Sequence, residues 1–354
     1  MIPREDIQKI LEYGCMAPSG DNSQPWRFKI DKRTVHIFNE PSSDESLYNF
    51  RQQASYVAHG ALAENILIAA PPLGYSAQLA FFPEATNANY VARVTFEPAV
   101  SRGDPLFDAI PKRTTNRKPY DQKSIKTVHA AALIACAKEL GRGTVKLLED
   151  RIDIEKIAHA ISINERVVLE NQHLHQFLFQ HIRWTDEEAR KNLSGMHLKT
   201  FELRGLQTAV FRLFRSWGAL SFFNKLGAAR RVAKDNAKVY SSSAAIGIVL
   251  VPNNTSRDFL TAGRIMQRVW LKATVFGLSM QPVTGVILLM QRILANEAGM
   301  LSPQHIELIT SAYRIIQQQF GIEKETIAML FRVGQSDAPT ARTKRYPVET
   351  LFMP

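Results

Sequence analysis

The chain has 354 residues, of which 45% are hydrophobic and 22% are charged, with two cysteines and a formal net charge of +11. The composition is typical of a soluble globular protein, and the length suits two merged lobes. Two cysteines exclude a disulfide framework, and no apolar run approaches the about 20 residues needed to cross a bilayer. We therefore expect a cytoplasmic protein without an integral membrane segment. The positive charge is compatible with nucleic acid, but the basic residues are scattered and no nucleic-acid motif with interleaved aromatics is present, so we expect no nucleic acid partner.

The first predicted element is a helix from about Arg4 to Met16, because apolar residues recur there at helical spacing. A half-buried strand follows from residue 27 to residue 30. The segment between them, residues 17–26, reads Ala-Pro-Ser-Gly-Asp-Asn-Ser-Gln-Pro-Trp. Its prolines stiffen the backbone, while the Gly-Asp-Asn run permits turns and leaves amides and side-chain oxygens free to face a planar polar heterocycle. An ordinary loop between a helix and a strand is the alternative.

A segment beginning at Gly60 aligns without gaps on a second segment beginning at Gly263, with apolar positions in register. The glycines, the serine and the glutamine coincide: Gly60 with Gly263, Gly74 with Gly277, Ser76 with Ser279, and Gln78 with Gln281. This pattern predicts an internal repeat, with one copy in each half of the chain. Pro71 and Pro72 should end the first helix early. Cys15 and Cys136 lie on apolar helical faces and are expected to be core thiols.

Residues 113–120 read Arg-Thr-Thr-Asn-Arg-Lys-Pro-Tyr. Arg113 and Arg117 lie four residues apart around hydroxyl donors, a composition suited to binding a phosphate monoester. A basic solvated loop is the alternative.

The middle of the chain, from about residue 171 to residue 240, is rich in aromatic residues with arginines between them. Residues 206–231 could form a basic amphipathic helix that lies on a membrane surface or on a partner. We favour helices folded across a site as a lid, because an exposed aromatic patch of this size promotes aggregation. His173, His175 and His181 lack a further ligand at matched spacing, so no metal site is expected.

The second copy of the repeat ends in the turn Gln-Pro-Val-Thr-Gly at residues 281–285. A buried strand is predicted from residue 326 to residue 334, and a basic segment, residues 341–347, follows it.

The segment at residues 17–26 resembles the Pro-Ser-x-x-Asn-x-Gln-Pro-Trp signature of the nitroreductase superfamily of FMN enzymes. The family resemblance implies that this loop contacts the flavin ring. The residues so implied are Pro18, Ser19, Asn22 and Gln24.

Residues 113–117 resemble the family's Arg-x-Ser/Thr-x-Arg/Lys phosphate motif, although the family carries that motif at the start of each subunit. The resemblance assigns Arg113, Thr115 and Arg117 to the FMN phosphate. At the end of the chain, Arg345 matches a basic residue that returns to the phosphate, with Lys344 or Arg342 in support.

The turn after the second repeat resembles the family's Pro-x-x-Gly turn, whose last two amides point at flavin N5. This assigns Pro282, Val283, Thr284 and Gly285 to cofactor binding. Hydrogen-bond donation at such a position stabilises negative charge on a reduced flavin. No catalytic side chain is expected, because the chemistry is centred on the flavin.

The resemblance implies an α+β, nitroreductase-like fold, in which two tandem degenerate halves form an intramolecular pseudo-dimer with antiparallel sheets flanked by helices. We expect halves at residues 1–110 and 111–354, with a helical lid insertion at about 171–240. The Gly60 and Gly263 helices should pack against each other across the pseudo-twofold. The single-chain order is similar to the Acg-like branch, which has one lidded FMN site. We expect a monomer or a weak homo-oligomer.

The implied function is an FMN-dependent oxidoreductase that transfers hydride from NAD(P)H to a small electron-poor acceptor, nitroaromatic or quinone-like. The alternative is an FMN-binding, sequestering protein with a lidded site and little turnover. A third possibility is an oxidase of a modified peptide, as in azoline-forming relatives, which normally work beside a cyclodehydratase.

Overall fold

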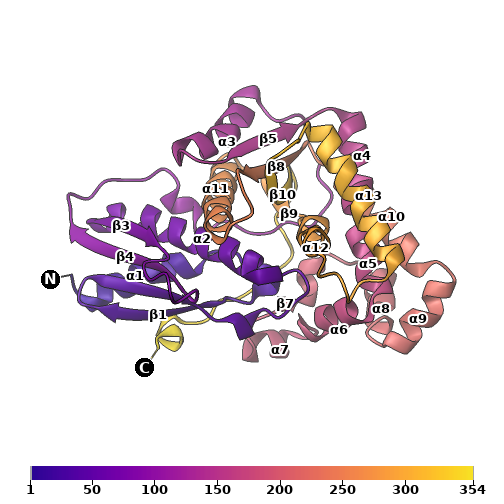
Figure 1. The fold of residues 1–354 in the computed structure, drawn as a ribbon, viewed down its shortest axis with the longest axis horizontal. Helices are drawn as coiled ribbons and strands as arrows, with labels where there is room; N and C mark the ends of the chain where they lie inside the picture. The colour runs from indigo at the N-terminus through magenta and orange to yellow at the C-terminus, as the bar shows by residue number, and fades with distance from the viewer. Residues whose placement is uncertain (1, 354) are drawn as a thin grey trace.

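The computed structural model describes residues 2–353, and the N-terminal part of the chain forms the first of two main sheets (Figure 1). Its antiparallel strands, in the order β1-β2-β4-β3, are β1 (Trp26–Asp31), β2 (Thr34–Asn39), β4 (Tyr90–Pro98) and β3 (Tyr75–Phe81). Helices α1 (Arg4–Cys15) and α2 (Gln53–Ala69) pack on this sheet, because Ile7, Ile10 and Leu11 lie in the same buried cluster as its strand residues. Helix α1 ends one residue before the predicted Met16.

The second sheet is buried on both faces. Its antiparallel strands, in the order β5-β8-β10-β9, are β5 (Thr144–Leu148), β8 (Ala245–Val251), β10 (Thr326–Gly334) and β9 (Ser279–Pro282). Along β8, alternate residues join different clusters: Val249 packs with α3 (Thr127–Glu139) and α11 (Ser256–Val275), whereas Ile248 packs with the helices on the opposite face. Those helices are α4 (Arg151–Ile161), α5 (Ile163–Glu170), α10 (Ala228–Ser241), α12 (Gly285–Leu294) and α13 (Pro303–Phe320).

Helices α2 and α11 cross at the centre of the molecule, between the two sheets (Figure 1). Glycine permits the crossing: a Cβ on Gly60 would lie 2.0 Å from the Leu260 carbonyl oxygen, and one on Gly263 would lie 2.0 Å from that of Val57. The predicted packing of the Gly60 and Gly263 helices is therefore confirmed. So is the α+β class with antiparallel sheets flanked by helices.

Glu64 ties the two central helices together electrostatically. Its carboxylate, in a residue that is 1% exposed, pairs with Arg264 at 2.7 Å and with Arg268 at 2.6 Å. Glu64→Ala should lower the free energy of unfolding by about 3 kcal/mol, because Arg264 loses its carboxylate partner and Arg268 keeps only Glu139, at 3.0 Å. Urea denaturation measures the change. The control is Glu97→Ala, which breaks the exposed Arg33 pair and should cost less than about 1 kcal/mol. Equal losses in the two variants would contradict this account.

The segment after β10 returns to the first sheet. Val348 and Leu351 belong to the buried cluster of that sheet, and the Met353 amide donates to the Phe28 carbonyl at 2.8 Å. In Figure 1 the C-terminus accordingly lies beside β1. The core of the first sheet is thus completed by residues from the other end of the chain. Our division into halves at residue 110 stays a prediction.

The aromatic-rich middle folds as a helical insertion with its own core. Its elements before α10 are α6 (Gln172–Gln180), β6 (Ile182–Arg183), α7 (Asp186–Lys191), β7 (Met196–His197), α8 (Leu206–Leu213) and α9 (Trp217–Lys225). The buried residues of its core include Phe179, Trp184, Phe214 and Leu220. Both cysteines are free and buried, as predicted. Within residues 2–353, no helix combines the length and the apolar character needed to cross a membrane.

Candidate functional site

The loop after α1 is a tight turn that directs two amide side chains inward. Asp21, Asn22 and Gln24 have φ values of 45°, 60° and 52°, in the left-handed region that Asp and Asn tolerate better than most residues. The Ser19 hydroxyl accepts a hydrogen bond from the Gln24 amide at 3.0 Å and closes the turn. Pro18 precedes it, half-buried. Asn22 and Gln24 are consequently buried, at 6% and 0% exposure.

These two amides join the loop to the basic segment near the end of the chain. The Asn22 Oδ1 accepts from the Arg345 guanidinium at 2.5 Å, and the Asn22 Nδ2 donates to the Lys344 carbonyl at 3.1 Å. The Gln24 Oε1 accepts from the Tyr346 amide at 2.8 Å. The structure therefore brings together four residues predicted from separate motifs.

The insertion closes on the same loop. The Leu193 carbonyl accepts from Asn22 Nδ2 at 2.8 Å and from Gln24 Nε2 at 2.9 Å. In this arrangement both amide groups are held by the segment between α7 and β7.

Three arginines lie close to one another beside the loop that holds Asn22 and Gln24, and we call them the arginine cluster: Arg113, Arg342 and Arg345. Arg113 is 8% exposed, donates to the Met16 carbonyl at 2.9 Å and lies 4.4 Å from the centre of the Trp270 ring. Burial, and then the charges of Arg345 and Arg342, hold its pKa well below the ordinary value. Burial lowers the pKa of Arg345 to about 10.

The arginine cluster is short of negative partners. Among residues 2–353, none of its members forms an ion pair with a carboxylate, and the Nε atoms of Arg113 and Arg345 are buried without a hydrogen-bond partner. Uncompensated buried guanidinium groups are costly, and a phosphate or carboxylate that accepts from their free N–H groups relieves that cost. The arrangement is suited to an anionic ligand.

The other residues of the phosphate motif face elsewhere. Thr115 lies beside Met280 of β9, in an isolated parallel bridge. Arg117 donates to the Thr200 carbonyl at 3.2 Å and lies 5.6 Å from the Phe201 ring, so it contacts the insertion. Arg113 and Arg117 thus point to different surroundings, and a shared role at one phosphate stays a prediction.

The turn at residues 282–285 opens helix α12. Pro282 pairs with Phe331, and the Val283 amide donates to the Leu330 carbonyl at 2.8 Å, which fixes the turn to β10. The Thr284 and Gly285 amides stand at the helix start, where helix geometry leaves amides without an intrahelical acceptor. A Cβ on Gly285 would lie 2.0 Å from Asn164 Oδ1, so α5 covers this glycine closely.

Several polar side chains, two of them carboxyl groups with raised pKa values, lie beside the turn and the Asp21 loop. Tyr48 donates to Asn164 Oδ1 at 2.8 Å, and Tyr240 donates to Glu165 Oε1 at 2.7 Å. Burial raises the pKa of Glu165 to about 7, and burial together with Asp44 raises the pKa of Asp21 to about 6. Sequence reasoning missed Asp44, Tyr48, Asn164, Glu165 and Tyr240, because they belong to no motif and only the fold brings them together.

Glu165 should make stability depend on pH. Its carboxyl keeps its proton up to about pH 7 in the folded chain but has an ordinary value of 4.5, so the stabilisation present below pH 4.5 is lost as the pH rises toward 7. Glu165→Gln, which keeps an oxygen for Tyr240, should therefore gain stability relative to the unmodified protein between pH 5 and pH 8. Urea midpoints across this range measure the difference. Glu155→Gln, at an exposed carboxyl on α4, is the control. If the urea midpoints of Glu165→Gln changed with pH in the same way as those of the unmodified protein, the raised pKa of Glu165 would be contradicted.

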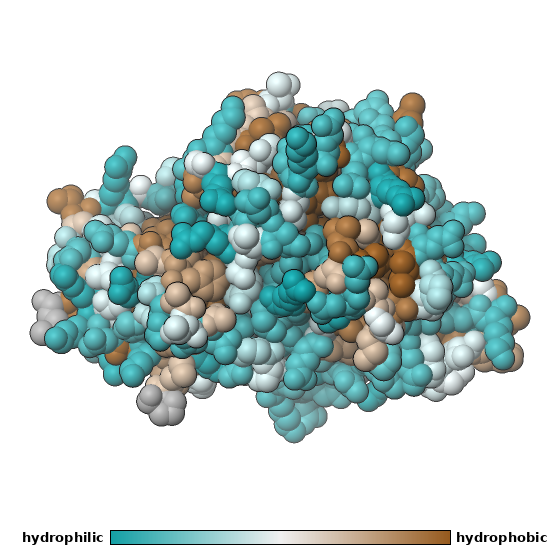
Figure 2. Space-filling view, in the orientation of Figure 1, coloured by the Kyte–Doolittle hydropathy of each residue, from teal (hydrophilic) through white to brown (hydrophobic). Residues whose placement is uncertain are grey.

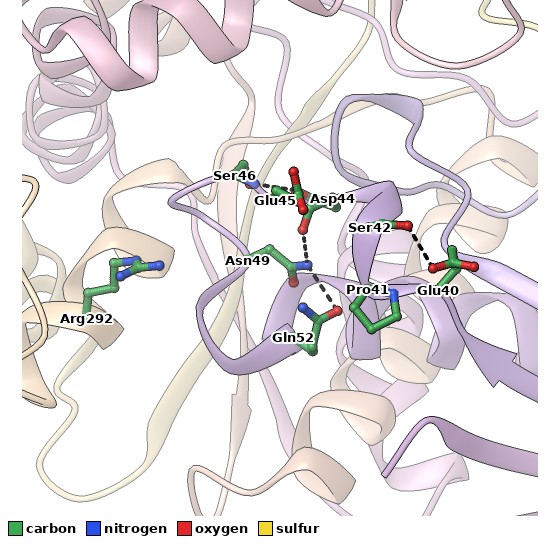
Figure 3. Close-up of a pocket in the computed structure, with 9 residues that line it drawn as sticks. All are labelled: Glu40, Pro41, Ser42, Asp44, Glu45, Ser46, Asn49, Gln52 and Arg292. Atoms are coloured by element: carbon green, nitrogen blue, oxygen red, sulfur yellow. Dashed lines mark hydrogen bonds between the residues drawn. The ribbon is translucent and has the colours of Figure 1, made fainter. Parts of the chain in front are cut away.

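An open hollow of about 520 Å³ adjoins the site between residues 40–52 and helix α12. Figure 3 shows Asp44 hydrogen-bonded among Ser46 and Asn49, with Arg292 of α12 on the facing side. Asp44 also borders the loop of the site, since a Cβ on Gly20 would lie 3.0 Å from its Oδ2. The buried Asp44 thus lines the hollow and also lies next to the loop of the site.

No family model matches the chain, but several curated proteins of known sequence are similar to it. In Mycobacterium tuberculosis, Acg, named as a candidate NAD(P)H nitroreductase, is 31% identical over 125 residues, which is 34% of this chain and 37% of Acg. An uncharacterised protein of the same organism is 24% identical over 291 residues, 81% of this chain and 40% of that protein. The chain thus spans about 40% of the length of these curated relatives. Another uncharacterised protein is 24% identical over 294 residues, 79% of this chain and 78% of its own length.

Solved structures give looser matches. An FMN-dependent nitroreductase of Mycobacterium smegmatis, solved with NADPH, matches 70% of this chain and 96% of its own at 13% identity and a TM-score of 0.37. A BluB-like flavoprotein of Clostridium difficile matches 70% of this chain and 97% of its own at 12% identity and a TM-score of 0.41. At such scores no residue role transfers. The resemblance to the nitroreductase superfamily that the motifs predicted is supported by the curated relatives.

Proposed function

We propose that this relative of the nitroreductase superfamily binds one FMN and acts as an FMN-dependent oxidoreductase. The observation that carries the proposal is the arginine cluster, in which Arg113 and Arg345 each keep a buried Nε without a partner. A phosphate monoester would supply the missing acceptors and the missing negative charge. The residues present therefore fit the anionic end of FMN.

The other predicted contacts would hold the rest of the same ligand. Asn22 and Gln24 would present their amides from the loop, while Thr284 and Gly285 would donate from the start of α12, where the helix dipole favours negative charge. Pro18, Ser19, Thr115, Arg117, Pro282 and Val283 stay predicted contacts. The chemistry that FMN supplies when bound is transfer of a hydride from reduced nicotinamide to an electron-poor acceptor of nitroaromatic or quinone type.

The side chains of this chain would provide position and charge for that reaction. Burial by α5 at the turn, and by the insertion at the loop of Asn22 and Gln24, would exclude water, which strengthens electrostatic interactions there. The open hollow beside Asp44 would offer a small-molecule acceptor a way toward the loop at residues 20–24. We further propose a cytoplasmic protein that works as a monomer or weak homo-oligomer, without nucleic acid.

A second candidate function, FMN sequestration with little turnover, is favoured by one observation. The Leu193 carbonyl occupies the amides of Asn22 and Gln24, so the insertion covers the loop that would face the flavin. If this lid stays closed, cofactor is retained but acceptors cannot approach.

Two measurements on the purified chain test both functions. A visible spectrum, before and after addition of FMN, should show bound flavin at about one per chain. Oxidation of NADH and NADPH is then followed with a quinone and with a nitroaromatic acceptor. Stoichiometric flavin with sustained turnover supports the oxidoreductase, and stoichiometric flavin with a negligible rate supports sequestration. A colourless chain that does not take up FMN would overturn both.

A further inference from the structure

The helical insertion presents an apolar ridge to solvent. We define the ridge as five side chains of α8, α9 and the residue that follows α9: Leu206, Val210, Leu213, Phe222 and Leu226. Their exposed fractions are 78%, 38%, 48%, 60% and 74%. Several large apolar side chains left exposed on two consecutive helices indicate an interaction site.

The ridge follows from the local sequence. In α8, Leu206, Val210 and Leu213 recur at i, i+4 and i+7 and share one side of the helix. Phe211 and Phe214 lie on another side and pack in the core of the insertion. Helix α8 is therefore apolar on two sides, and only one of them has a partner within residues 2–353.

The charges around the ridge have one sign. From residue 203 to residue 234 the sequence contains no Asp and no Glu. Its basic residues, all exposed, are Arg204, Arg212, Arg215, Lys225, Arg230, Arg231 and Lys234. Within residues 2–353, one of these seven forms an ion pair, that of Arg231 with Asp235. Figure 2 shows brown among teal at the edge of the molecule beside α9.

This combination selects among possible occupants. A second copy of the chain docked ridge to ridge would bring two sets of seven like charges together, which disfavours it. Nucleic acid would match the charge but would leave five large apolar side chains against a phosphate backbone. An anionic membrane surface matches both features, because apolar side chains enter the acyl boundary while Lys and Arg bind lipid phosphates.

We propose that the α8–α9 ridge docks the protein on an anionic lipid surface. Leu206, Leu213 and Phe222 would enter the interface, and Arg204, Arg212 and Lys225 would bind headgroup phosphates. Docking is peripheral: it needs no membrane-crossing segment and does not depend on flavin binding.

Co-sedimentation of the full chain with vesicles tests the proposal. Vesicles of phosphatidylcholine alone are compared with vesicles that contain 30% phosphatidylglycerol, at 0.1 M and at 0.5 M salt. We expect binding to the anionic vesicles, with a loss at high salt because surface charges are screened. Equal binding to both vesicle types, or no binding to either, would overturn the proposal.

Two triple variants separate the apolar and the electrostatic contributions. Leu206→Ser with Leu213→Ser and Phe222→Ser should weaken binding at least about tenfold. Arg204→Gln with Arg212→Gln and Lys225→Gln should weaken it about a hundredfold. All six positions are exposed, so thermal unfolding should match that of the unmodified chain.

Matched controls change the same numbers of apolar and basic residues elsewhere. Val128→Ser, Ile152→Ser and Leu294→Ser remove exposed apolar side chains, and Lys9→Gln, Lys29→Gln and Lys112→Gln remove exposed charges. These controls should retain vesicle binding within about threefold, since they lie outside the ridge. Losses as large as those of the ridge variants would overturn the proposal. Binding of both ridge variants to DNA is measured alongside. If the apolar variant bound vesicles normally, and the charge variant lost binding to both vesicles and DNA, the ridge would be a general polyanion surface and the proposal would be overturned.

Discussion

Gly263→Ala should lower the free energy of unfolding by at least about 3 kcal/mol, because the added Cβ would meet backbone and not a movable side chain. That Cβ would lie 2.0 Å from the Val57 carbonyl oxygen and 3.0 Å from the Gly60 Cα. The two central helices would have to separate, and the interface on which both sheets rest would lose its packing. Urea denaturation followed by circular dichroism measures the loss. Gly60→Ala should reproduce it from the other side of the crossing.

Gly218→Ala is the matched control for this prediction. Gly218 lies within helix α9, and the nearest atom to an added Cβ is the Ser216 Oγ, at 3.9 Å. The same chemical change should there be neutral or slightly stabilising, by up to about 1 kcal/mol, since alanine favours helix more than glycine does. Comparable stability of Gly263→Ala and Gly218→Ala would show that the close approach of α2 and α11 is not required.

Arg113→Gln should weaken FMN binding by about ten- to a hundredfold, because it removes a charge-assisted contact to the phosphate worth about 1.5–3 kcal/mol. Riboflavin, which lacks the phosphate, should bind the variant and the unmodified chain equally well. Flavin fluorescence titration with both ligands measures the ratio. The chain without flavin should lose little stability, since the change removes a buried charge that Arg345 and Arg342 also repel.

Arg51→Gln is the control for the phosphate contact, because Arg51 is an exposed arginine paired with Glu297 at 2.6 Å. It should leave the affinities for FMN and riboflavin unchanged. If Arg113→Gln weakened both ligands equally, the arginine would support the ring site or the fold and not the phosphate. Unchanged FMN affinity would remove the phosphate assignment altogether.

The parts of the fold that sequence reasoning predicted well are those encoded by short-range signals. Glycines in register between two helical segments predicted the crossing at Gly60 and Gly263, because only a residue without a side chain permits two backbones to approach so closely. Turn-forming residues predicted the loop that holds Asn22 and Gln24. The arginine cluster followed in part, since its members come from two recognisable basic segments.

What sequence reasoning missed depends on long-range contacts. Asn164 and Tyr48 are 116 residues apart and form no spacing pattern, yet they meet at the turn that begins α12. The direction of Arg117 is set by the Thr200 carbonyl of the insertion, 83 residues away. Loop side chains take the orientation that their tertiary partners allow, so a motif names such residues without fixing where each one points.

The return of residues 348–353 to β1 has a consequence for biosynthesis. A ribosome that has translated β1 to β4 has made every strand of the first sheet, but Val348 and Leu351, which fill its core, emerge some 250 residues later. At roughly 5–20 residues per second, the nascent sheet would wait many seconds with an incomplete interior. The early-made portion of this polypeptide would then be a client for chaperones until the last segment is released.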